Sequence, residues 1–158
     1  MMTKEERIAK AVSLFKEGYN CSQSVVGAYA DLYGFTSEQA FHMAASFGGG
    51  IGRMRETCGA ACGMFLLAGL ERCAVVGADR AGKAANYALV QQLAARFKEQ
   101  TGSLRCADLL GLSKKEPIVP TPEERTPQYY AKRPCPKMIE LAARIFGDFL
   151  EEQGRFAK

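Results

Sequence analysis

The chain has 158 residues, of which 47% are hydrophobic and 24% are charged, the size and composition of one globular domain. Its six cysteines are too few for a dense disulfide scaffold. Lys and Arg number 21 against 17 for Asp and Glu, and no basic stripe with interleaved aromatic residues accompanies this small excess. We therefore expect a single domain over residues 1–158 and no nucleic-acid partner.

The first ten residues are charged and contain no apolar run, so they do not resemble a secretory signal. The most apolar stretch, from Cys58 to Leu70, has 13 uncharged residues, whereas a membrane span needs about 20. We expect a buried helix there and no membrane insertion. Without an export signal the expected compartment is the cytoplasm, where cysteines more often bind metal or perform redox chemistry than form structural disulfides.

Apolar residues recur at helical spacing along most of the chain, and glycines or capping residues separate these stretches. The sequence predicts an all-α, single-domain bundle of about five to six helices, with a long proline-rich arm before the last helix. In the fifth helix we expect Tyr87 to lie on the buried face with Leu93 and Phe97. The expected helices span residues 4–18, 22–33, 36–47, 56–76 and 79–100, a short turn at 103–110, and a last helix that has Pro136 near its start and runs to residue 152.

All six prolines lie within residues 117–136, so the segment 112–134 is predicted to be irregular. It is either a surface loop or an arm that covers a site or embraces a partner subunit, because structureless loops of this length are often functional. In each case it must bring Cys135 back to the helical bundle. Its expected trypsin sites, when it is accessible, are Lys114, Lys115 and Arg125.

Four cysteines share one position in the predicted local structure, which is the start of a helix. A helix N-terminus has unpaired amide groups and the positive end of the helix dipole. Both favour the thiolate form, so we expect them to lower the pKa of these cysteines. Thiolate is the form that binds metals and attacks disulfides. The cysteines at predicted helix starts are Cys21, Cys58, Cys106 and Cys135.

The remaining cysteines and the single histidine fit structural roles. Cys73 is interpreted as a core thiol of the fourth helix, and Cys62 either as a core thiol or as part of a site shared with Cys58, one turn away. His42 lies alone in the third helix, where a structural role is commoner than catalysis. No C-x-x-C pair occurs, which argues against a thioredoxin-like site and against paired zinc knuckles.

A glycine-rich loop, residues 48–52, precedes Arg53, Arg55 and the fourth helix. Such a loop can cradle an anion or let the backbone approach a cofactor closely. It is either a tight connection between two packed helices or a source of amide groups near the Cys58 sulfur, and we favour the second. The glycines expected beside a cofactor are Gly49, Gly50, Gly52 and Gly59.

A family resemblance is carried by the combination of these motifs over residues 5–150. The chain resembles the redox-active proteins that are named after a C, GCAxxG, C, C cysteine pattern. The family's four signature cysteines correspond to the four at predicted helix starts. The matching segments are Gly18–Ser22, Gly48–Gly52, Cys58–Gly63, Cys106 shortly before Leu109-Leu110-Gly111, and Arg133-Pro134-Cys135.

The resemblance implies a small helical redox protein of anaerobic prokaryotes that forms a homodimer. A related domain occurs in split-Soret cytochromes, which hold an iron–sulfur type centre besides haem. This chain has no C-x-x-C-H motif for covalent haem attachment, so only the cysteine site is expected to be shared.

Three functions remain open from the sequence. Four thiolates suit a [2Fe–2S] cluster, a [4Fe–4S] cluster or zinc, and we favour the [2Fe–2S] cluster. Such a centre would serve redox sensing, or electron transfer with an unidentified redox partner protein. Alternatively, a pair of these cysteines performs thiol–disulfide exchange without a metal. The third alternative is a non-catalytic helical interaction protein whose cysteines belong to its core.

Overall fold

The computed structural model describes residues 1–112 and 117–156, and that part of the chain is helical without a strand, which confirms the all-α prediction. Four of the eight α-helices it contains have fewer than nine residues, so the helix count exceeds the five to six expected. The elements in chain order are α1 Lys4–Lys16, α2 Cys21–Gly27, the 3₁₀ helix η1 Ala30–Tyr33, α3 Ser37–Ala44, the 3₁₀ helix η2 Ala45–Phe47, α4 Gly59–Glu71, α5 Arg80–Thr101, α6 Cys106–Leu110, α7 Pro127–Lys132 and α8 Cys135–Glu152.

Local capping fixes where several helices begin. Thr3, Asn20 and Thr36 each form a capping box, in which the cap side chain accepts a hydrogen bond from the amide three residues later and the side chain at that later position reaches back. These reciprocal bonds satisfy two amides that would otherwise be unpaired at the helix start. The box at Asn20 makes Cys21 the first residue of α2.

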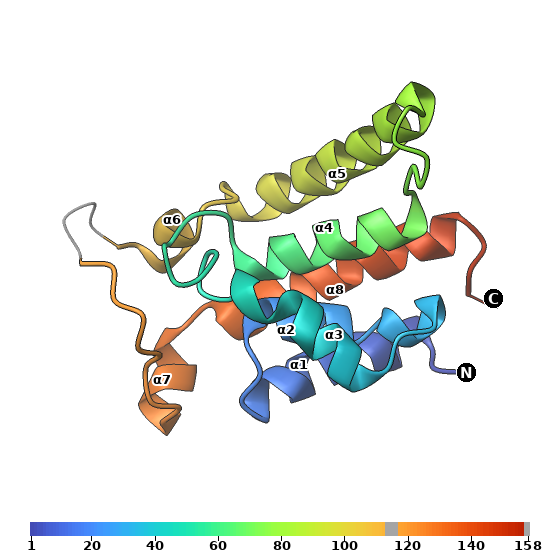
Figure 1. The fold of residues 1–158 in the computed structure, drawn as a ribbon. Helices are drawn as coiled ribbons and strands as arrows, with labels where there is room; N and C mark the ends of the chain where they lie inside the picture. The colour runs from blue at the N-terminus through green and yellow to red at the C-terminus, as the bar shows by residue number, and fades with distance from the viewer. Residues whose placement is uncertain (113–116, 157–158) are drawn as a thin grey trace.

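The core lies between α1, α2, α4 and α8, with α5 packed against the outer side of α4 and α8 (Figure 1). Helix α8 runs through the middle of the bundle and buries Phe146, Phe149 and Leu150. The buried Tyr29 ring packs edge-on against Phe146, and its hydroxyl donates a 2.7 Å hydrogen bond to the Ala143 carbonyl. None of the helices in the described residues is both long enough and apolar enough to cross a membrane.

Two predicted helices end earlier than the sequence suggested. Helix α2 ends at Gly27, and the chain continues as η1 rather than as one helix to residue 33. Helix α4 ends at Glu71, where Arg72 leaves the helical conformation and places its guanidinium 5.2 Å from the Phe149 ring centroid. Cys73 therefore lies beyond the helix and is exposed, so its interpretation as a core thiol is wrong.

Helix α5 agrees with its predicted bounds, but its buried face is shorter than expected. Its buried residues are Leu89, Leu93 and Phe97. Tyr87 is 59% exposed, so the prediction that it faces the core is wrong. The N-terminal half of α5 diverges from α4 (Figure 1), which leaves no surface for the Tyr87 ring to pack against.

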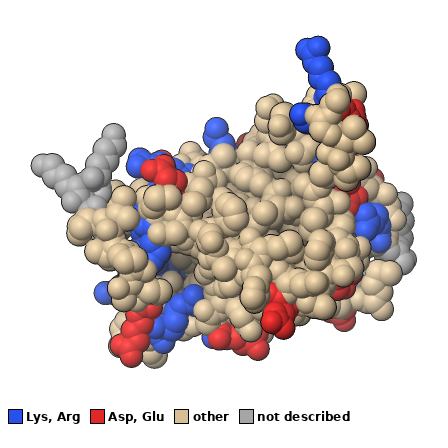
Figure 2. Space-filling view, viewed as in Figure 1, with Lys and Arg blue, Asp and Glu red and all other residues tan. Residues whose placement is uncertain are grey.

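The proline-rich segment is partly helical rather than irregular throughout. Thr126 caps α7, and Pro127 occupies its first turn, where the missing amide hydrogen of proline has no cost. The described part of the segment lies at one end of the bundle, where Lys and Arg side chains gather between it and the helices (Figure 2). Of the expected trypsin sites, Lys114 and Lys115 lie outside the described residues.

Candidate functional site

The four signature cysteines all lie at helix starts, as predicted. Cys21, Cys106 and Cys135 are the first residues of α2, α6 and α8, and Cys58 is the N-cap of α4. Cys58 and Cys106 are buried, whereas Cys21 and Cys135 are partly exposed, and all are free thiols.

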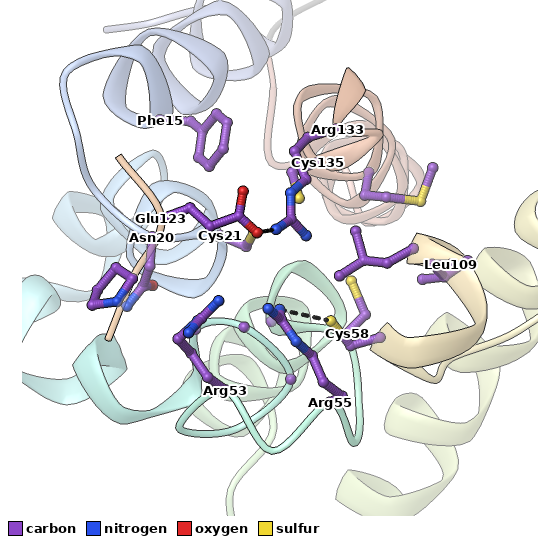
Figure 3. Close-up of a pocket in the computed structure, with 18 of the residues that line it drawn as sticks. Phe15, Asn20, Cys21, Arg53, Arg55, Cys58, Leu109, Glu123, Arg133 and Cys135 are labelled. Carbon is purple, nitrogen blue, oxygen red and sulfur yellow. Dashed lines mark hydrogen bonds and ion pairs between the residues drawn. The ribbon is translucent and has the colours of Figure 1, made fainter. Parts of the chain in front are cut away.

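These four cysteines line one cavity of about 430 Å³ at the end of the bundle (Figure 3). The prediction that the four helix starts lie close together is therefore confirmed. The cavity wall also includes the glycine loop and the proline-rich arm, which come from segments more than 60 residues apart. The glycines predicted beside a cofactor, Gly49, Gly50, Gly52 and Gly59, are all part of this wall, and their contact with a cofactor stays a prediction.

Cys58 and Cys106 are held together by their backbones. The Cys58 amide donates to the Leu104 carbonyl and the Cys106 amide to the Glu56 carbonyl, both at 2.6 Å. Thr57 and Arg105 form an isolated antiparallel bridge between them. This short pairing docks α6 beside the start of α4, and no alternating pattern in the sequence predicted it.

Burial, rather than the helix dipole, dominates the acidity of two of these thiols. It raises the pKa of Cys58 to about 11, and the nearby amides of Ala60 and Ala61 only partly oppose the rise. Burial also raises the pKa of Cys106, and the Arg55 guanidinium, which lowers that pKa, only partly offsets the rise. The pKa of Cys21 is raised as well, first by its hydrogen bond with Cys135. The expectation that helix starts lower these pKa values is therefore wrong for three of the four cysteines, because desolvation outweighs the dipole at Cys58 and Cys106 and the hydrogen bond with Cys135 does so at Cys21.

Cys135 is the exception. Its hydrogen bond with Cys21 lowers the pKa of Cys135 to about 7, and the guanidinium groups of Arg133 and Arg125 add to the effect against the opposing influence of burial. In this coupled pair Cys135 ionises first and Cys21 retains its proton. The site therefore contains one thiol that is readily ionised near neutral pH.

The glycine loop packs tightly against the cysteines. A Cβ added at Gly50 would lie 2.6 Å from the Cys106 Cβ, and one at Gly59 would lie 3.2 Å from the Cys21 Cβ. The amides of residues 51–56 donate to carbonyls of residues 46–51. The amides of Ile51 and Gly52 are therefore used locally and do not serve Cys58. That Gly48, Gly49 and Gly50 supply amides near the Cys58 sulfur stays a prediction.

The loop has an unusual backbone. Residues 49–53 all have positive φ, and they include two that are not glycine, Ile51 at 64° and Arg53 at 61°; Arg55 follows at 61°. Left-handed conformations cost roughly 1–2 kcal/mol at a residue with a Cβ. Of these three strained residues, Arg53 and Arg55 line the cavity, and strained backbone is common at functional sites.

Four arginines line the cavity, Arg53, Arg55, Arg125 and Arg133. Arg55 Nη1 donates to the Cys106 sulfur at 3.9 Å. Arg53 donates to two carbonyls of the arm, Val119 at 2.8 Å and Thr121. Arg133 pairs with Glu123. The sequence indicated Arg53 and Arg55 by their place next to the glycine loop and Arg133 as part of the family segment Arg133-Pro134-Cys135, whereas Arg125 stood out only as a trypsin site.

The arm is fastened over the cavity by Arg125. Its guanidinium donates to the carbonyls of Phe15 at 2.8 Å and Tyr19 at 3.1 Å, and it lies 4.2 Å from the Phe15 ring centroid. Of the two interpretations of this segment, the arm is the one that agrees with the structure, since Pro120, Pro122 and Tyr129 are part of the cavity wall. That the cavity is a functional site stays a prediction.

The other candidate residues lie apart from the cavity. Cys62 is buried, its thiol donates to the Thr57 carbonyl at 3.7 Å, and burial raises its pKa to about 12. This agrees with core packing. His42 is exposed, with Glu38 one helical turn away, so it has no core role. Within residues 1–112 and 117–156, no group of three His, Cys, Asp or Glu side chains is arranged to hold a metal ion.

The fold and the site thus define the protein class: an all-helical protein with four cysteines at one arginine-lined cavity. Residues 19–149 match the family model described as "Putative redox-active protein (C_GCAxxG_C_C)". The match covers more than half of the chain, and the chain belongs to this family of redox-active proteins. Searches of the curated proteins and of the solved structures returned no match.

Proposed function

We propose that the four signature cysteines form one redox centre that binds an iron–sulfur cluster, for electron transfer or redox sensing. The observation that carries this proposal is the convergence of Cys21, Cys58, Cys106 and Cys135 on one cavity. Thiolates are the usual ligands of such clusters, and membership of a redox-active family agrees with the assignment.

The four cysteine sulfurs are suitable ligands for a two-iron cluster. The cysteines form two pairs, Cys21 with Cys135 through their hydrogen bond, and Cys58 with Cys106 through their backbones. A [2Fe–2S] cluster takes two thiolates at each iron, whereas a structural zinc ion takes all four ligands at one point. The arrangement of the cysteines in two pairs supports [2Fe–2S] over zinc.

A cluster bound at these residues would supply one-electron chemistry. The protein's own contribution is charge and shielding. Arg55, Arg125 and Arg133 place positive charge beside the thiolates, and positive charge near a cluster favours its reduced state. The arm, held by Arg125, covers the cavity and limits the access of water.

The alternative is thiol–disulfide exchange by Cys135 and Cys21, and the lowered pKa of Cys135, to about 7, favours it. In this reaction the Cys135 thiolate attacks a substrate disulfide and releases one substrate thiol. Cys21 then loses its proton and displaces the second substrate thiol, leaving a Cys21–Cys135 disulfide. The substrate disulfide gains the two electrons that the two cysteines lose.

Purification without oxygen tests the proposal. Protein expressed with iron is expected to show visible absorption, with about two irons and two acid-labile sulfides per chain for a [2Fe–2S] cluster. Cys58→Ser should abolish both. Cys73→Ser, which changes an exposed cysteine outside the cavity, is the matched control and should retain them.

The outcomes separate the alternatives. Stoichiometric zinc without iron would contradict the cluster and indicate a zinc site. Absence of any metal, together with a Cys21–Cys135 disulfide seen by mass spectrometry after exposure to air, would favour thiol–disulfide exchange. Absence of both would leave the non-catalytic interaction protein.

We also propose that the protein forms a homodimer, receives electrons from a partner protein and works in the cytoplasm. Six free thiols suit a reducing compartment. Val75, Val76 and Tyr87 are exposed apolar side chains on α5 and on the connection that leads to it, and together they offer a contact surface. Light scattering should give twice the chain mass of 17.2 kDa, and Tyr87→Glu should reduce it to one chain.

A further inference from the structure

The cavity has the size of a small-molecule site. Its volume is about 430 Å³. Pockets that bind small molecules commonly measure about 300–1,000 Å³. There is therefore room for a small molecule beside the four sulfur atoms.

The fixed charge of the cavity wall is strongly positive. Among the residues that the structure describes, its charged side chains are four arginines and one glutamate, Glu123, an excess of three positive charges. Arg53 and Arg55 come from the glycine loop and Arg133 from the arm, and all three side chains are directed toward the cavity (Figure 3). Basic side chains are also visible from outside, beside a hollow between the arm and the bundle (Figure 2).

These charges repel one another in a partly buried place. Burial, followed by the charges of Arg55 and Arg133, lowers the pKa of Arg53. The hydrogen bonds from Arg53 to the carbonyls of Val119 and Thr121 do not neutralise its charge. Arg53 and Arg55 also stand at positive φ, where glycine would be less strained. The chain thus accepts both repulsion and strain to keep two guanidinium groups here.

We propose that the cavity binds a small anion with two or more oxygen atoms, held by Arg53, Arg55 and Arg133 beside the cysteines. Guanidinium groups present paired N–H donors that match the oxygens of a carboxylate or of an inorganic oxyanion. The anion relieves the repulsion among the three arginines. The proposal rests on the proposed function only for the redox centre next to the anion, because binding itself requires no metal.

Calorimetric titration of the full-length, metal-free protein tests this directly. The buffer is dilute Tris chloride with dithiothreitol, which contains no competing oxyanion, and the probes are sodium sulfate and sodium acetate. Saturable binding of one probe or both is expected, and the stronger probe shows whether inorganic oxyanions or carboxylates are preferred. Saturable binding of neither probe overturns the proposal.

Variants connect the binding to the named arginines. Arg55→Met should weaken binding by about tenfold or more, which corresponds to about 1.4 kcal/mol. Arg53→Met provides an independent test if Arg55→Met does not fold, which circular dichroism would show. Arg96→Met removes a partly exposed arginine of α5 that lies outside the cavity and pairs with Glu152, and it should leave binding unchanged. Equal affinity of wild type and both cavity variants overturns the proposal.

A second titration separates this proposal from the proposed function. Protein loaded with its metal centre should still bind the probe, because the anion and the sulfur atoms occupy different parts of the cavity. Loss of probe binding on loading would show that the arginines serve only the thiolate centre, which overturns the anion site. Failure to load metal, with probe binding intact, contradicts the cluster and leaves the anion site standing.

Discussion

Replacing Gly50 by alanine tests how closely the glycine loop is fitted to the cysteine cavity. Gly50 has a φ of +78°, and a Cβ there would lie 2.6 Å from the Cys106 Cβ and 2.8 Å from the Arg55 Cα. The Arg55 Cα is a backbone atom, so a side-chain rotation cannot relieve that contact. The change must therefore displace the loop or the start of α6.

The magnitude follows from three contributions. Alanine at positive φ costs roughly 1–2 kcal/mol, and the smaller entropy of the unfolded alanine chain returns about 0.4–1 kcal/mol. Overpacking adds about 1–3 kcal/mol. We expect Gly50→Ala to lower the free energy of unfolding by about 2–4 kcal/mol, which leaves a typical domain folded because such domains have about 5–15 kcal/mol.

Gly52→Ala is the matched control. Gly52 lies in the same loop with a φ of +57°, but its added Cβ would meet only the Ser46 carbonyl oxygen at 3.9 Å. It therefore carries the conformational cost without the overpacking, and about 1 kcal/mol is expected. Urea denaturation followed by circular dichroism measures both values on the metal-free, reduced protein.

A second measurement connects stability to the site. Gly50→Ala should lose metal under conditions where Gly52→Ala retains it, because only the first substitution displaces Cys106. Equal losses of unfolding free energy in the two variants would refute the close fit between Gly50 and Cys106. The loop would then be a connection without a role in shaping the cavity.

Three further predictions concern the thiols and the arm. The pKa of Cys135 is lowered to about 7 and thiolate is the reactive form, so the rate of Cys135 alkylation by iodoacetamide should reach half its plateau near pH 7. The alkylation rate of Cys58, with a pKa of about 11, should still be rising at pH 10. Peptide mass spectrometry measures both rates, and a half-point for Cys135 near pH 9 contradicts the assignment. Trypsin should cut after Arg125 more slowly in the metal-loaded protein than in the metal-free reduced protein, because a metal at Cys135 clamps the end of the arm, and equal rates would mean that Cys135 is not tied to a metal. Cys62→Ala should lower the free energy of unfolding by about 1 kcal/mol, as a small truncation in the core, and Cys73→Ser should change it by no more than about 0.5 kcal/mol, as a surface change. Neither variant should have a reduced iron content, and iron loss in either would place that cysteine in the site.

Local chemistry explains why the cysteine placement was readable from the sequence. The capping box at Asn20 needs only residues 20–23, and it alone makes Cys21 the first residue of α2. Pro136 is tolerated only in the first turn of a helix, so it locates the start of α8 at Cys135. Capping and proline geometry act over about four residues, a range within which the sequence by itself determines the backbone.

Properties that depend on distant neighbours were decided only by the tertiary structure. Cys58 and Cys135 both stand at helix starts, yet the pKa of one rises to about 11 and that of the other falls to about 7. Burial controls the first and a hydrogen bond with Cys21, more than 100 residues away, controls the second. The exposure of Cys73 likewise follows from Arg72 meeting the Phe149 ring of α8. Desolvation and charge act between groups that folding brings together, and no local pattern along the chain records which groups those are.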